Sequence, residues 1–408
     1  MEEWKTYKIG EICESISDTY KGKAPNVVLV NTSDVYDGVC LNHTYVPNKD
    51  LKGQFKKIFK RNDILYSEIR PANRRFAFVD FAPENYIAST KLMVIRCSKL
   101  VRPRYLYHYL KRQEMLDELQ ALAESRSGTF PQITFSELAL FEISLPSLTT
   151  QDKIVAAIDC FDDKIALNNR INHNLEEQAQ ALYKSWFVDF EPFKDGKFID
   201  SELGMIPDGW HVKRVGDLPL FIADYVANGS FASLKENVRL YESEQYAVFI
   251  RNTDLKAGVF PVFVDTHSYN FLSKTKLSGG EIIISNVGDV GSVHFCPVLN
   301  RPMTLGNNVI MIKADERRYY SFLYLCFKYF SGHHSIDGIT GGSAMPKFNK
   351  TDFKGIKIIV PPQDIMSRFD AIASLLFQDI DHNKRECEKL SVQRNTLLPA
   401  LMSGQLIC

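Results

Sequence analysis

The chain has 408 residues, of which 45% are hydrophobic and 24% charged, and its basic and acidic residues are equal in number. These proportions exclude a mainly disordered chain, and the length is enough for two or three domains. No apolar run approaches the roughly 20 residues of a membrane span, and the start Met1–Lys5 does not resemble a signal peptide. The eight cysteines lack Cys-x-x-Cys spacing. We therefore expect a cytoplasmic protein with reduced thiols, no structural zinc and no membrane contact.

Residues 1–150 form the first predicted domain. Its elements, in order, are β-like runs at 27–30, 64–69 and 91–95, a helical stretch at 104–122, a glycine loop at 127–133 and an apolar strand at 143–146. The aromatic residues at helical spacing predict buried core rather than a platform for base stacking. They are Tyr105, Tyr107 and Tyr109, with Phe322, Tyr324 and Phe327 in the second half.

Residues 151–190 are assigned to a long spacer helix, because no proline or glycine interrupts 151–187 and its apolar positions alternate in steps of three and four. At 1.5 Å per residue the helix would be roughly 55 Å long, too long to be buried by one compact domain. Thr149 and Asp152 predict an approximate capping box at its start. The seam residues are Ile154, Ile158, Phe161, Ile165, Asn168, Asn172, Leu175, Ala179, Leu182 and Trp186.

A linker at 191–209, rich in Gly, Pro and Asp, is expected to connect rather than to pack into a core. The pattern of the first half then repeats over 210–362, where Trp210 and Gly216 match Trp4 and Gly10 at an offset of 206. The repeated elements are β-like runs at 247–250, 281–287 and 309–312, a helical stretch at 317–329, a glycine loop at 342–348 and a strand at 356–362.

Residues 363–404 predict a second long helix, preceded by Pro362. We expect it to pair antiparallel with the first helix, with Asn172 opposite Asn383, since a polar Asn in a seam lowers stability but fixes register. The alternative is two unrelated amphipathic helices, each packed on its own domain. Shifting the first seam by 215 positions predicts the second seam: Phe369, Ala373, Leu376, Ile380, Asn383, Cys387, Leu390, Arg394, Leu397 and Leu401.

These features predict an α+β fold with a pseudo-two-fold internal repeat. Two similar α/β domains, 1–150 and 210–362, are separated by two long helices that form an antiparallel coiled coil. Both domains have a slight excess of lysine and arginine over acidic residues. Two similar basic domains at a fixed separation suit a ligand with two similar sites, such as duplex DNA.

Loops at matching places in both halves are the candidate DNA contacts, although each residue alone also fits a solvated loop. Arg, Lys, Asn and Gln read base edges, while Lys, Arg and Ser contact phosphates. The candidates in the first half are Arg70, Asn73, Arg74, Arg75, Lys91, Arg126, Ser127, Thr129 and Gln132. Those in the second half are Asn286, Asp289, Ser292, Asn307, Asn308, Ser343, Lys347 and Asn349.

Catalytic motifs are not found in the sequence. There is no phosphate-binding P-loop, no Asn/Asp-Pro-Pro-aromatic motif of an amino-methyltransferase and no glycine-rich turn suited to S-adenosylmethionine. A metal nuclease needs carboxylates that converge on the ion. Asp162 with Lys164 lies on the predicted coil, and Asp208 lies in the linker. We therefore expect no cofactor, no metal and no catalytic activity in the chain itself.

Three segments carry a resemblance to a known family. They are Leu145-Pro146 followed by Gln151-Asp152-Lys153-Ile154, then Ser185-Trp186-Phe187-Val188-Asp189-Phe190, and Gly204-Met205-Ile206-Pro207-Asp208-Gly209-Trp210. Over essentially its full length the chain resembles the specificity subunit of type I restriction–modification enzymes. One departure is that the second half ends Leu398–Gly404 and lacks the Trp-Phe-Val-Asp-Phe of the first helix, so the two docking surfaces are expected to be unequal.

The resemblance implies two target recognition domains that each read one half of a split DNA sequence. It also implies helices that dock two methyltransferase subunits, with translocase/nuclease subunits joining the complex. Because Arg70 stands against Gly288 and Lys91 against Asn308, we expect the target to be asymmetric. A coiled-coil scaffold with no nucleic-acid role and a freestanding enzyme with an unrecognised site are the alternatives.

Overall fold

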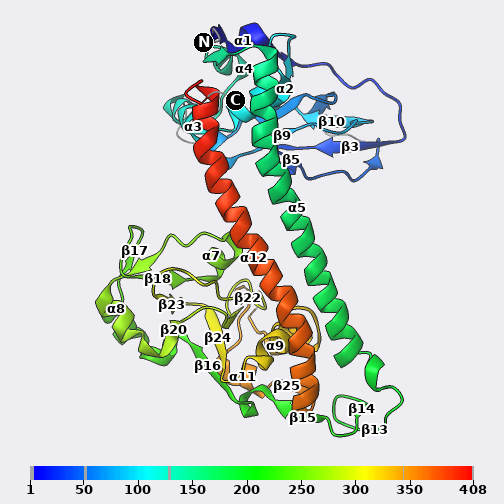
Figure 1. The fold of residues 1–408 in the computed structure, drawn as a ribbon, viewed down its shortest axis with the longest axis vertical. Coiled ribbons are helices and arrows are strands. Elements are labelled where there is room, and N and C mark those ends of the chain that lie inside the picture. Colours follow the sequence, from blue (N-terminus) through cyan, green and yellow to red (C-terminus); the bar gives the residue numbers. More distant parts are fainter. Residues whose placement is uncertain (1–3, 50–52, 127–129, 343, 407–408) are drawn as a thin grey trace. The chain divides into compact units, whose positions relative to one another are not determined.

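The computed structural model describes residues 4–49, 53–126, 130–342 and 344–406 (Figure 1). The chain divides into two compact units, the first holding Met1–Asn168 with Arg385–Cys408 and the second Asn169–Lys384. Two helices of 40 residues, α5 (Leu148–Phe187) and α12 (Gln363–Met402), each contribute one part to each unit.

The first unit contains two four-stranded sheets that share a core. Val28 and Ala88 of one sheet are buried against Leu65 and Val94 of the other. One sheet has the order β2 (Cys13–Ile16), β11 (Leu92–Cys97), β8 (Ile64–Ser67) and β9 (Phe76–Phe78), all antiparallel. The other has the order β6 (Val46–Pro47), β3 (Asn26–Val30), β10 (Tyr86–Ser89) and β7 (Phe55–Lys57), in which β3 and β10 are parallel.

Helices cover the other face of the β2–β11–β8–β9 sheet. The buried residues Tyr66 and Met93 on that face pack in one core with Tyr105, Leu116 and the other aromatic residues of the helices. These helices are α2 (Pro103–Leu110) and α3 (Gln113–Arg126). The smaller elements are α1 (Ile9–Ile12), α4 (Phe135–Leu138), the pair β1 (Lys5–Lys8) and β12 (Glu142–Leu145), the hairpin β4 (Val35–Tyr36) and β5 (Val39–Cys40), and the 3₁₀ turns η1 (Thr32–Asp34) and η2 (Pro71–Asn73).

The second unit repeats this arrangement. One antiparallel sheet has the order β16 (Leu220–Asp224), β24 (Val309–Ala314), β21 (Ile282–Ser285) and β22 (Val293–Phe295), and the other has the order β17 (Leu240–Tyr241), β19 (Phe263–Val264), β18 (Ala247–Ile250), β23 (Met303–Leu305) and β20 (Lys276–Leu277). A pair, β15 (His211–Arg214) and β25 (Lys357–Val360), matches β1 and β12. The helices are α6 (Phe231–Asn237), α7 (Asn252–Ala257), α8 (Thr266–Phe271), α9 (Arg318–Tyr329), α10 (Ser331–Ile339) and α11 (Lys350–Gly355), with 3₁₀ turns η4 (Val215–Asp217), η5 (Tyr225–Asn228) and η6 (Ser273–Thr275).

Matched strand pairing confirms the predicted internal repeat. Ser67 of β8 pairs with Leu92 of β11, and Ser285 of β21 pairs with Val309 of β24, at offsets of 218 and 217. A parallel strand pair also occurs in each unit, β3 with β10 and β18 with β23. Mainly antiparallel sheets with helices gathered on one face make this an α+β fold.

In the first unit, the N-terminal half of α5 packs antiparallel to the C-terminal half of α12. Ile154 of α5 and Leu401 of α12 belong to the same buried core. Further along, Arg394 pairs with Asp162 at 2.5 Å, and the Asn168 side chain donates to Glu386 at 2.6 Å.

In the second unit, the C-terminal half of α5 packs antiparallel to the N-terminal half of α12. The Asn383 side chain donates to the Asn172 side chain at 2.9 Å, which confirms the predicted pair. The Phe187 and Phe369 rings meet edge to face at 4.7 Å. Every predicted seam residue of both helices is buried or half-buried, so the coiled-coil prediction is confirmed within each unit.

Three local predictions are wrong. The helix α5 begins at Leu148, so Thr149 lies inside it, and the Ser147 hydroxyl accepts from the Thr150 N–H at 3.3 Å in place of the expected capping box. The stretch 104–122 is two helices, because the chain breaks where Lys111 reaches Asp162 of α5 at 2.7 Å.

The linker 191–209 is also not a simple connection. It contains η3 (Glu191–Phe193) and the paired strands β13 (Phe198–Ile199) and β14 (Ile206–Pro207). Ile206 is buried in the core of the second unit, and the Phe193 ring contacts Trp210 at 5.2 Å. The aromatic residues near the linker therefore give it a packed structure despite its turn-rich composition.

Replacing Asn172 by Ala should lower the thermal midpoint of the protein. The Asn383 amide would lose its partner in a half-buried seam, a loss that typically costs about 1–3 kcal/mol. The double variant Asn172→Leu with Asn383→Leu removes both polar groups and should recover the midpoint, which calorimetry can measure. A single variant as stable as the wild type would show that this hydrogen bond does not contribute.

Candidate nucleic-acid interface

In the first unit, three candidate segments meet at the end of β8. Ile69 forms an isolated β-bridge with Gln132, and the Arg70 N–H donates to the Pro131 carbonyl at 3.1 Å. The Lys91 ammonium donates to the Gln132 side chain at 2.9 Å. The loop after β8, the turn before β11 and the loop after α3 therefore form one surface.

The second unit joins its candidate segments through the same kind of backbone contacts. Val287 forms an isolated bridge with Lys347, and the Gly288 N–H donates to the Pro346 carbonyl at 2.8 Å. The Phe348 N–H donates to the Asn286 carbonyl at 3.1 Å. Both domains thus bring their candidate loops together through equivalent backbone hydrogen bonds.

Corresponding hydrogen bonds align the two surfaces residue by residue. The Glu68 N–H donates to the Lys91 carbonyl at 3.0 Å, and the Asn286 N–H donates to the Asn308 carbonyl at 3.1 Å. The Ser67 N–H donates to the Arg75 carbonyl, and the Ser285 N–H donates to the Ser292 carbonyl. The resulting equivalent pairs are Arg70 with Gly288, Arg74 with Gly291, Lys91 with Asn308 and Gln132 with Lys347.

Two arginines of the first domain adopt a backbone conformation that favours glycine. The φ angles are 44° at Arg70 and 54° at Arg74, and the equivalent Gly288 and Gly291 have 79° and 80°. A left-handed conformation costs a residue with a side chain about 1–2 kcal/mol. Strained residues of this kind cluster at functional sites. The first domain therefore carries arginine side chains at two positions where the backbone alone would favour glycine.

Most described candidates are accessible. Arg74, Arg75, Gln132, Asn286 and Ser292 are half-buried. The fully exposed candidates are Arg70, Asn73, Lys91, Asp289, Asn307, Asn308, Lys347 and Asn349. Ser127, Thr129 and Ser343, with the side chain of Arg126, lie outside the described residues.

Several candidate side chains have structural partners that the sequence pattern does not reveal. The Asn349 side chain caps α11 by accepting from the Asp352 N–H at 2.8 Å, and the Asn286 amide donates to the Phe348 carbonyl at 3.3 Å. The Asp289 carboxylate lies 2.7 Å from the Lys256 ammonium, and this contact holds the pKa of Asp289 below its usual value.

Two residues of the interface were missed by the sequence analysis. The Glu68 carboxylate lies 3.6 Å from the Lys91 ammonium and occupies the position of Asn286 in the repeat, a match that the strand offset could have indicated. Lys256 of α7 reaches Asp289 from a distant part of the sequence, and no local signal indicates that contact.

Comparisons with known proteins agree with this two-domain arrangement. The family model described as the type I restriction modification DNA specificity domain matches residues 1–177 and again 207–385. The chain is 33% identical to the type I restriction enzyme HindI specificity subunit of Haemophilus influenzae, over the full length of both proteins. The chain belongs to this family.

Two further comparisons extend the finding. The type I restriction enzyme MjaIX specificity subunit of Methanocaldococcus jannaschii is 28% identical over 99% of this chain and 94% of its own. The crystal structure of a type I restriction–modification system S subunit from M. genitalium matches with a TM-score of 0.54 and 17% identity, over 98% of this chain and 96% of that one. The second likeness shows the same fold.

Membership of the family decides between the functions that the sequence leaves open. The chain is a specificity subunit, the non-catalytic component of a type I restriction–modification enzyme, and its function is to recognise a DNA sequence. Nothing supports the alternative of a scaffold without DNA binding. In the described part of the chain, no helix is both long and apolar enough to cross a membrane.

A half-buried ionic cluster joins α2 to α5 in the first unit of this specificity subunit. Ligand atoms of His108, Asp159 and Asp162 lie within 4.8 Å of one another, a spacing that could hold a metal ion. Arg104 already lies 3.0 Å from Asp159, and Lys111 lies 2.7 Å from Asp162. An ion would have to displace these cations and Arg394, so we assign the cluster to internal ion pairing.

His108 is neutral in this cluster at physiological pH. Burial lowers its pKa to about 4, and its Nε2–H donates to the Asp159 carboxylate at 2.7 Å. An unfolded histidine has a pKa near 6.5. The unfolded chain therefore binds more protons than the folded chain between pH 6.5 and pH 4, and stability falls as the pH drops through that range.

Acidification from pH 7 to pH 5 should destabilise the first unit through His108. The difference between folded and unfolded pKa values predicts a loss of up to about 2 kcal/mol in this interval. The variant His108→Gln keeps a donor for Asp159 but cannot take up the proton, so its calorimetric midpoint should change less between the two pH values. Equal pH dependence in the variant and the wild type would assign the loss to other groups.

Proposed function

We propose that each domain of this specificity subunit reads one half of a split, asymmetric duplex DNA target through its matched loops. The two target recognition domains are 1–150 and 210–362, the spacer helices are 151–190 and 363–404, and 191–209 joins them. The observation that carries the proposal is the convergence of candidate residues at equivalent places in both repeats, through equivalent backbone hydrogen bonds.

Different side chains on this shared backbone account for the asymmetry of the target. The first domain presents Arg70, Lys91 and Gln132 where the second presents Gly288, Asn308 and Lys347. Arginine and lysine favour guanine edges, while asparagine and glutamine favour adenine. Two surfaces with unequal donor and acceptor sets would select different half-sites.

The paired helices would set the gap between the half-sites and dock the other subunits. A helix of 40 residues is roughly 60 Å long, and its seam is paired within each unit. We propose two methyltransferase subunits on this coil, with translocase/nuclease subunits joining the complex. The chain itself would bind no cofactor and act in the cytoplasm, where its DNA target lies.

The proposal is tested by a gel shift of duplex DNA, with and without methyltransferase subunits. Sequencing the methylated sites in cells that express the chain with its partners should then reveal a two-part motif with a fixed gap. A continuous motif, or no motif, would contradict the division of recognition between two domains.

The variant Arg70→Ala should relax recognition of one half of the motif. Loss of a base contact costs on the order of 1–3 kcal/mol, and Arg70 belongs to the first domain. The methylation pattern should become degenerate in that half alone. The matched control Lys347→Ala should affect only the other half. Equal loss in both halves would show that the domains do not read independently.

Adding one heptad to each spacer helix should lengthen the gap without changing either half-site. Seven residues add about 10 Å, close to three base pairs of DNA. The insertions belong directly after Asn172 in α5 and directly before Asn383 in α12, so that the two added heptads face each other and the seam stays in register. A heptad in α5 alone should impair folding or binding. An unchanged gap in the double insertion would remove the spacer role from the coil.

A further inference from the structure

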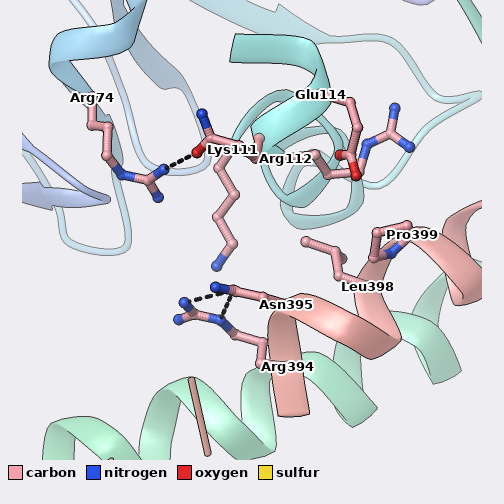
Figure 2. Close-up of a pocket in the computed structure, with 9 residues that line it drawn as sticks. Arg74, Lys111, Arg112, Glu114, Arg394, Asn395, Leu398 and Pro399 are labelled. Carbon is pink, nitrogen blue, oxygen red and sulfur yellow. Dashed lines mark hydrogen bonds between the residues drawn. The ribbon is translucent and has the colours of Figure 1, made fainter. Parts of the chain in front are cut away.

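A small cation-lined pocket lies in the first unit, between η2, the junction of α2 with α3, and the last turns of α12 (Figure 2). Its cavity is about 80 Å³, several times the space of one water molecule. Arg74, Lys111, Arg112 and Arg394 line it, with Glu114 as the acidic member and Leu398 as an apolar wall.

Internal partners leave the pocket with one uncompensated positive charge. Lys111 and Arg394 share a single carboxylate, Asp162, at 2.7 and 2.5 Å. Arg74 pairs with Asp37 at 2.7 Å. Arg112 and Glu114 are the other two charged residues of the lining, so the groups named here sum to one positive charge. A single oxyanion group would complete the charge balance.

Arg112 is the one of these four cations for which no carboxylate partner is found among the described residues. Its Nε–H donates to the Tyr109 carbonyl at 3.2 Å, and its guanidinium stacks over the Tyr109 ring at 4.0 Å. These contacts hold the planar group in place. In the described part of the chain, no carboxylate forms an ion pair with Arg112 at its terminal nitrogens, which remain available to a ligand.

Arg74 reaches the pocket from a strained backbone position. Its Nη1 donates to Gln113 at 3.4 Å, as the dashed line in Figure 2 shows. The equivalent position in the second domain is Gly291, which has no side chain to place in such a pocket. A Cβ added there would lie 3.3 Å from the His333 ring. The seam position equivalent to Arg394 is Ala179, which is buried. The second domain thus lacks two of the four cations.

We propose that this pocket binds one phosphate group of the DNA backbone, and that it does so in the first domain only. The inference rests on the proposed function of the chain. A guanidinium presents paired N–H donors to phosphate oxygens, and phosphate contacts fix the position of a protein on the duplex without reading its sequence. Because Arg394 and Leu398 belong to α12, the bound phosphate would also join the recognition domain to the spacer coil.

The dependence of DNA affinity on salt tests the proposal. Each phosphate neutralised by a cation adds about 0.9 to the slope of log affinity against log salt concentration. The variant Arg112→Gln should lower this slope by about 0.9 and weaken binding equally for targets altered in either half-site. The variant Arg112→Lys keeps the charge and should keep the slope, which separates the electrostatic contact from any effect on packing.

A matched variant changes the charge in the opposite direction. Glu114→Gln removes the acidic side chain of the pocket wall and should tighten DNA binding at a given salt concentration while leaving the slope unchanged. Weaker binding of this variant would contradict the assignment of an anion to the pocket. Calorimetry of each variant without DNA confirms that it is folded.

Inorganic phosphate distinguishes a DNA phosphate from a free one. If the wild type binds DNA but Arg112→Gln has the same salt slope, the DNA contact is overturned. Stabilisation of the wild type by phosphate, absent in Arg112→Gln, would then identify a site for free oxyanion only. Failure of the wild type to bind DNA, with or without its partners, would instead overturn the proposed function.

Discussion

The antiparallel pairing of α5 and α12 is the constraint on which the other features depend. Neither helix is buried by a single domain. Ile154 and Ile158 of α5 belong to the core of the first unit, whereas Tyr183 and Phe187 belong to the core of the second. Each helix is therefore an internal part of both domains, and its seam cannot slip without removing large side chains from two cores. The Asn172–Asn383 hydrogen bond adds a polar pair that is satisfied in one register.

The two halves of the internal repeat share a backbone arrangement but carry different side chains on it. Equivalent backbone hydrogen bonds hold the loops in both domains, so the position of the interface does not depend on which side chains it presents. Under the proposed function, specificity would reside in side chains on that backbone, and these differ at the aligned candidate positions. Arg70 and Arg74 are the extreme case, because the first domain tolerates backbone strain at both positions where the second has glycine. Under the proposed function, a shared backbone with two different surfaces would allow the two half-sites to change separately.

Patterns with a fixed period could be predicted from the sequence, and contacts between distant segments could not. The seam residues, the Asn172–Asn383 pair and the repeat follow from spacing alone, and the repeat places the candidate loops at matching positions in both halves. The capping box at Thr149 failed because Ser147 is an equally good cap two residues earlier. The linker was predicted to be a simple connection because it is rich in turn residues. The burial of Ile206 depends on a core formed by other parts of the chain, which the local sequence does not indicate. The cap at Asn349 and the Lys256–Asp289 pair likewise depend on the folded surroundings.

The ionic cluster beside the coil is better understood as a device for orientation than as a source of stability. Burial opposes ionisation of Asp162, yet Lys111 and Arg394 outweigh it and hold the Asp162 pKa below its usual value. Burial likewise lowers the pKa of Lys111, so both partners pay a desolvation cost for the pair. Apolar residues of similar volume would often be at least as stable. Apolar residues would not fix the orientation of the helices in the same way. The Asp162 carboxylate on α5 holds both Lys111, at the end of α2, and Arg394 of α12. That three-way contact fixes how α2 lies against α5 and α12 in the first unit, and the proposed spacing of two half-sites would need that orientation to be defined.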